Sequence, residues 1–153
     1  MSKKAVAIGV ALALVVVAIV LRGRVTRPAT PEATINALFE AAARGDDGTY
    51  MGLISGALRK SLEETRSQVG AEKFRRNLRD SVAGLKGLAV SAGRDAPPGQ
   101  VALDVELVFA DRNERQRILL ASEGTGWVIV ALSAGSGQKP RVPYGTPVYG
   151  DQP

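Results

Sequence analysis

The amino-acid sequence predicts an α+β fold with an N-terminal transmembrane helix, three helical segments packed on a curved four-stranded antiparallel sheet, and an extended C-terminal tail. Three observations support this prediction. Residues 5–21 carry no polar side chain. Apolar residues recur at helical spacing between residues 30 and 83, and after Gly84 they alternate with polar residues as in strands. Helices followed by strands are typical of a domain whose helices cover one face of a single sheet.

The apolar run at residues 5–21 is flanked by Lys4 and Arg22. Its seventeen residues span roughly 26 Å as a helix, close to the thickness of a bilayer core. A cleaved signal peptide also has a basic start and an apolar centre, but its cleavage site needs small residues where this chain has Arg22 and Arg24. The sequence therefore favours an uncleaved membrane anchor over residues 1–22.

The basic residues on the two sides of this anchor are nearly balanced, so charge does not decide its orientation. The layout of the chain is the remaining guide. A short N-terminal tail before a long domain is typical of a signal anchor. We therefore expect a cytoplasmic N-terminus, a linker over residues 23–29 and a periplasmic domain at the cell membrane. Within the run, Gly9 lies four residues from both Ala5 and Ala13, a small-residue spacing that allows close helix contact. Gly9 is therefore a candidate contact with another transmembrane helix.

The net charge of +5 belongs to the anchor and its flanks. Residues 1–27 contain five Lys and Arg residues and no acid, and the remaining fifteen basic residues balance all fifteen Asp and Glu residues. The rest of the chain is therefore neutral, which argues against a nucleic-acid partner. The expected partners are the lipid bilayer and other membrane subunits.

The chain contains neither cysteine nor histidine. Their absence excludes disulfides, thiol catalysis, a Ser-His-Asp triad and zinc sites built from cysteine or histidine. We therefore assign no catalytic residue, no metal ligand and no cofactor, and we expect a protein that is not an enzyme.

The first helical segment of the predicted domain, residues 30–132, has clear signals at both ends. Thr30 is a favoured N-cap residue, Pro31 suits the first turn, and Gly45 suits the C-terminal end. Between them, apolar residues at i, i+3, i+4 and i+7 form one face of a helix.

Two further helical segments are expected before the strands. Asp46 or Asp47 caps the second, which we expect to be short and to break near Gly56 because glycine weakens helices. The third runs over residues 71–83, with apolar residues on one stripe and basic residues around it.

Four strands are expected after Gly84, where the apolar residues change to a period of two. Turn residues separate them, and their expected ranges are 85–92, 101–109, 115–122 and 127–132. The fourth is apolar on both faces, so we expect it to lie in the centre of the sheet.

The tail, residues 133–153, contains four glycines and four prolines, so we expect an extended segment. Tyr144 and Tyr149 offer large contact areas, and nearby prolines lower the entropy lost on docking. These tyrosines are candidate partner contacts. The alternative is a disordered terminus without a binding role.

Three side chains were considered for catalysis. Asp104 and Glu106 lie two residues apart on one strand, so their carboxylates share a face. Because the opposite row is apolar, the favoured interpretation is a solvent-facing row. Tyr50 could polarise a substrate carbonyl, but its place on the apolar stripe of a helix favours core packing.

Residues 59–80 are locally basic, with a net charge of +3. Arg75, Arg76 and Arg79 are candidate contacts with lipid headgroups or an acidic partner. The alternative is a solvated helix surface in which Glu72 pairs with neighbouring arginines.

A family resemblance is carried by the segment TPEATINALFEAAARGDDGTYMGLISGALR and by the closing stretch GTGWVIVAL. Both resemble the nuclear-transport-factor-2-like, cystatin-like α+β cone superfamily, and the chain is most similar to membrane-anchored bacterial members. The positions that carry the first likeness are Pro31, Glu32, Phe39, Gly45 and Asp46. The resemblance implies a cone-shaped pocket between helices and sheet, and members include small isomerases, cyclases, assembly factors and binding modules.

The function that we expect is that of a non-catalytic, single-pass accessory subunit. Its helix, periplasmic domain and tail would dock on a larger membrane complex. One alternative is a binding module that holds a small ligand in the cone pocket, which Phe39, Tyr50, Phe109 and Trp127 would exclude if they filled it. The other alternative is a small isomerase or cyclase that uses Tyr50 or the two strand carboxylates.

Overall fold

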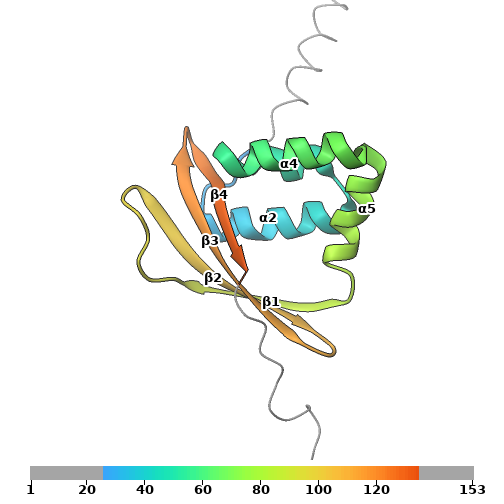
Figure 1. The fold of residues 1–153 in the computed structure, drawn as a ribbon. Coiled ribbons are helices and arrows are strands. Elements are labelled where there is room, and N and C mark those ends of the chain that lie inside the picture. Colours follow the sequence, from blue (N-terminus) through green and yellow to red (C-terminus); the bar gives the residue numbers. More distant parts are fainter. Residues whose placement is uncertain (1–25, 135–153) are drawn as a thin grey trace, which may run out of the picture.

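The computed structural model describes residues 26–134 as four helices followed by a four-stranded sheet (Figure 1). The helices lie on one face of the sheet, so the α+β architecture is confirmed. The elements are α2 (Pro31–Arg44), α3 (Asp47–Gly52), α4 (Gly56–Val69), α5 (Ala71–Ser81), β1 (Leu85–Ala92), β2 (Gln100–Phe109), β3 (Asn113–Glu123) and β4 (Gly126–Ala134).

The ends of α2 and α3 form as their sequences predict. The Thr30 side chain accepts a hydrogen bond from the Ala33 amide at 3.1 Å, which satisfies a donor at the start of α2. Gly45 ends α2 in the left-handed region at φ 65°. Asp46, rather than Asp47, caps α3 by accepting from the Thr49 amide at 3.0 Å.

Residues 26–134 form four helices where the sequence predicted three helical segments in the domain, so that number was wrong. The predicted break near Gly56 exists, but residues 56–69 continue as a separate helix, α4. The reason is that α4 contains no buried residue and contacts the core through few apolar side chains. A helix that is polar on most of its surface gives only a weak periodic signal.

The sheet is open and antiparallel, with its strands in the order β1-β2-β3-β4. The predicted bounds of β1 are confirmed, and β2, β3 and β4 extend one or two residues beyond their predicted ranges. β4 lies at one end of the sheet, so its predicted central position was wrong. Residues 53–55 lie against its outer edge and form backbone hydrogen bonds with Ile129, so this edge is covered although β4 ends the sheet.

The core lies between the helices and one face of the sheet, which we call the inner face. On β2 this face carries Leu103, Val105, Leu107 and Phe109, all almost fully buried. They pack with buried residues of the other strands and helices, including Ile35, Leu38, Leu53, Ile54, Ile118, Leu120 and Ile129.

Part of the predicted linker is docked on the domain. The Trp127 amide donates to the Pro28 carbonyl at 3.1 Å, and Arg27 pairs with Glu123 at 3.5 Å. A Cβ atom at Gly126 would come within 2.5 Å of the Arg27 Cβ, so glycine is what lets this segment approach β4.

None of the helices in the range 26–134 has the length and apolarity needed to cross a membrane. The predicted anchor, residues 1–22, and all of the predicted tail beyond Ala134 lie outside the described residues.

Candidate functional site

A cavity of about 350 Å³ lies between the inner face of the sheet and the helices. Its wall is mostly apolar and contains no charged side chain, and its residues are Leu38, Phe39, Ala42, Tyr50, Ser81, Val82, Leu107, Gln116, Leu132 and Ser133. Ser81 and Ser133 are exposed, so the cavity opens to solvent beside them.

The helices bring the aromatic part of this wall together. Leu38, Phe39 and Ala42 share one face of α2 because residues three and four apart are neighbours on a helix. The αL turn at Gly45 reverses the chain, so that α3 returns beside α2 and adds Tyr50 to the wall. Phe39 and Tyr50 therefore form the boundary of the cavity and do not fill it.

Two polar side chains of the wall, Tyr50 and Gln116, make no side-chain hydrogen bond with another residue in the range 26–134. Burial raises the pKa of the Tyr50 phenol, so this group stays neutral at physiological pH. Gln116 lies on the same face of β3 as Ile118 and Leu120, which places a neutral amide in an apolar surface. A third wall residue, Ser81, differs because its hydroxyl donates to the Leu78 carbonyl at 2.7 Å.

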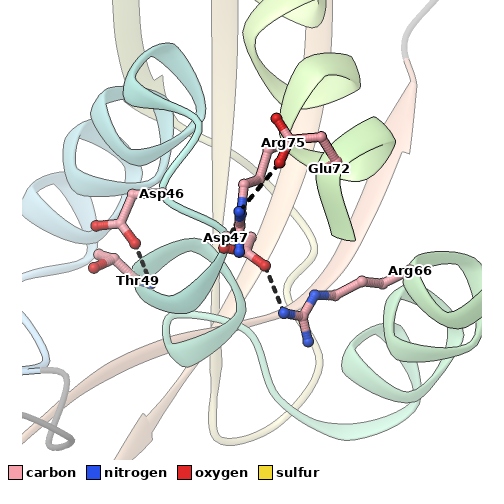
Figure 2. A network of polar contacts seen from close by, with 6 residues as sticks. All are labelled: Asp46, Asp47, Thr49, Arg66, Glu72 and Arg75. Atoms are coloured by element: carbon pink, nitrogen blue, oxygen red, sulfur yellow. Dashed lines mark hydrogen bonds and ion pairs between the residues drawn. The ribbon is translucent and has the colours of Figure 1, made fainter. Parts of the chain in front are cut away.

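A buried carboxylate, Asp47, holds α3, α4 and α5 together (Figure 2). Its Oδ1 accepts from Arg75 Nε at 3.0 Å, and its Oδ2 lies 2.7 Å from Arg66 Nη2. The second contact is an ion pair without the alignment of a hydrogen bond. Burial favours the neutral acid, but the Arg75 hydrogen bond and the charges of both arginines hold the pKa of Asp47 below its ordinary value.

The two strand carboxylates lie on the outer face of the sheet, away from the cavity. Asp104 accepts from Arg117 Nε at 2.9 Å, and Glu106 lies 3.9 Å from Arg115 Nη2. The hydrogen bond from Arg117 lowers the pKa of Asp104, which therefore stays ionised at neutral pH. With Ser91, these two pairs line a groove of about 540 Å³ whose charges are balanced. Glu106 also accepts from Asn113 Nδ2 at 3.1 Å, so both acids have partners on the outer face of the sheet.

The three arginines predicted as partner contacts have different surroundings in the structure. Arg75 is bound by Asp47 and also lies 3.5 Å from Glu72. Arg79 packs on Gly45, where its Nη1 occupies the space that a Cβ atom would need. Arg76 is exposed and has no ion pair with a residue of the described domain. The other candidate contacts, Gly9, Tyr144 and Tyr149, lie outside the described residues.

The sequence reasoning missed Gln116 and the role of Asp47. Gln116 could have been found from its spacing, because it continues the buried row of Ile118 and Leu120. Asp47 carried no comparable signal, because its arginine partners are 19 and 28 residues away in the sequence. Among residues 26–134 there is also no cluster of acidic side chains that could hold a metal ion.

Comparison of the chain with protein-family models, curated proteins and solved structures finds no match.

Proposed function

We propose that this protein is a membrane-tethered, non-catalytic binding protein whose domain holds a small, uncharged and largely apolar ligand. The cavity of about 350 Å³ between the helices and the sheet carries this proposal. Ligand sites in proteins are typically concave and mostly apolar, with a few polar groups that orient the ligand. The volume lies near the lower end of the usual range of about 300–1,000 Å³, so the ligand is small.

The absence of charge from the wall determines the class of ligand. A charged group placed in an apolar cavity loses its hydration and gains no partner here, which is costly. A neutral ligand with one hydroxyl or carbonyl group avoids this cost. That group would hydrogen-bond to Tyr50 or Gln116, whose side chains have no hydrogen-bond partner within the described domain.

The test is to titrate the full chain in lipid nanodiscs with 4-propylphenol and, in parallel, with 4-propylbenzoate. The phenol is neutral and the benzoate is charged, while their apolar parts match. We expect saturable binding of the phenol, seen as shifts of Tyr50 and Phe39 ring signals by NMR, and at least tenfold weaker binding of the benzoate. Equal affinity for the two compounds would contradict the proposal.

The variant Tyr50→Phe tests the orienting group. It retains the ring, so the fold should keep its stability, and removal of the hydroxyl should weaken phenol binding by about three- to tenfold. A second variant, Val82→Trp, blocks the cavity itself. It places a bulky ring in the wall and should abolish binding. Unchanged affinity in both variants would show that the phenol binds elsewhere.

A second function, that of an accessory subunit on a larger membrane complex, is favoured by the docked linker. The contacts of Arg27 and Pro28 with β4 leave only residues 23–26 between the predicted anchor, residues 1–22, and the docked segment. Four residues reach at most about 14 Å, so the domain would be held close to the membrane surface and to neighbouring subunits.

This second proposal predicts that the chain co-purifies with other membrane proteins. Membranes from cells at native expression would be solubilised gently and examined by native mass spectrometry. We expect a complex that Gly9→Leu weakens, because leucine would prevent the close helix contact at that position. A chain that runs alone as a monomer would contradict an accessory role.

A further inference from the structure

The free edge of β1 is an unused backbone surface. Among residues 26–134, β1 is the end strand of the sheet and pairs only with β2. The other end strand, β4, is covered at Trp127 and Ile129 by Pro28 and by residues 53–55. Within the described domain no comparable segment lies against Leu88–Ala92 (Figure 1).

The hydrogen-bond pattern identifies which groups face this edge. The Gly93 amide donates to the Ala102 carbonyl at 2.9 Å, so Gly93 points its backbone groups toward β2. In an antiparallel ladder alternate residues point in opposite directions. Leu88, Val90 and Ala92 therefore present their amide and carbonyl groups to the free edge.

In the part of the chain that the structure describes, this edge lacks the usual protection against pairing. End strands are commonly protected by charged side chains, by proline or by a covering segment. Residues 87–93 contain neither a charged residue nor proline, and Lys86 and Arg94 lie only at the two ends. The strand also keeps a regular register with β2 from Gly87 to Ala92.

We propose that β1 pairs antiparallel with β1 of a second copy of this chain, about a two-fold axis at Ala89. In this register Leu88 lies opposite Val90 of the second copy, and both belong to the set that faces the edge. Their side chains lie on the inner face, where they already pack on the core, so the two apolar rows become continuous. The pairing is self-complementary, as a two-fold interface requires.

The charged residues at the two ends of β1 favour this register over the one whose axis lies at Val90. With the axis at Ala89, Lys86 faces Ala92 of the second copy. With the axis at Val90, Lys86 would face Arg94 of the second copy, and like charges directly opposite destabilise a strand pair. An interface made of one strand pair is small, so a common membrane tether would strengthen it by raising the effective concentration.

Cysteine cross-linking tests this geometry directly, because the natural chain has no cysteine. In the full chain in lipid vesicles, Ala89→Cys would place two thiols at directly opposite, non-hydrogen-bonded positions. Their Cα atoms would be about 4.5 Å apart, which is within the range of a disulfide. We expect copper-phenanthroline to convert this variant to a covalent dimer roughly tenfold faster than Ala110→Cys, an exposed control beyond β2. Equal rates for the two variants would overturn the proposal.

A second pair of variants tests the association without a disulfide. Ala89 is exposed on the outer face, so Ala89→Lys should preserve the fold while it places two ammonium groups opposite each other. We expect FRET between labelled copies to fall to the background level in Ala89→Lys and to persist in Ala89→Ser. Unchanged FRET in the lysine variant, or a different protein cross-linked to the Ala89→Cys edge, would contradict pairing between copies.

Discussion

Replacing Asp47 with asparagine is expected to lower the free energy of unfolding by about 2 kcal/mol. The substitution keeps the shape of the side chain but removes the charge that binds Arg66 and Arg75 (Figure 2). A fully buried pair would cost more to break, but both arginines are more than 40% exposed, so water compensates part of the loss. Chemical denaturation of the solubilised full chain measures the difference. The control Glu63→Gln breaks the exposed pair with Arg59 and should cost less than about 0.5 kcal/mol.

The dependence of this difference on pH separates a charge effect from a packing effect. The folded-state pKa of Asp47 is depressed, so its contribution is present above the unfolded value near 3.8 and is lost as the pH falls through the folded value. The stability gap between the natural chain and Asp47→Asn should therefore narrow below pH 3.8. A gap that remains constant in acid would show that the carboxylate acts through packing alone.

Replacing Gly126 with alanine is expected to displace residues 26–28 from β4. The new Cβ would lie 2.9 Å from the Arg27 carbonyl oxygen, a backbone atom that cannot give way by a side-chain rotation. Displacement breaks the hydrogen bond from the Trp127 amide to Pro28 and the pair between Arg27 and Glu123. We expect a loss of about 1–2 kcal/mol in unfolding free energy and roughly tenfold faster hydrogen exchange at the Trp127 amide.

The matched control for this variant is Gly87→Ala. Gly87 is also in a strand, but its added Cβ would meet the Val108 Cβ at an ordinary 3.8 Å. Alanine at Gly87 should leave both the stability and the Trp127 exchange rate nearly unchanged. Equal effects of the two alanines would indicate a general cost of losing strand glycine.

The sequence predicted those elements whose signals are local. The N-cap at Thr30, the αL turn at Gly45 and the alternation in β2 depend on neighbouring residues, and all three appear in the structure. The helix α4 was missed because a helix attached by few apolar contacts needs little periodicity. The end position of β4 was missed because hydrophobicity reports burial and does not report which element causes it.

The candidate site was less accessible to prediction than the fold. Tyr50 and Phe39 were recognised as residues on apolar helix faces. That they line an open cavity could not be predicted, because the cavity depends on how α2 and α3 pack against β2, β3 and β4. The outward row of Asp104 and Glu106 was predicted from alternation, and the structure adds the arginines of β3 that pair with them. Those partners depend on strand register, which one strand alone does not encode.

The course of β4 has a practical consequence. The chain enters the domain beside Gly126, at the start of β4, whereas Leu132 and Ser133 of the cavity wall lie near its end. Seven residues of extended strand separate Gly126 from Ser133 by about 23 Å. Exchanging everything before residue 26 for a soluble carrier would therefore change the chain far from the cavity. The proposed tether and the proposed ligand site can therefore be altered independently of each other.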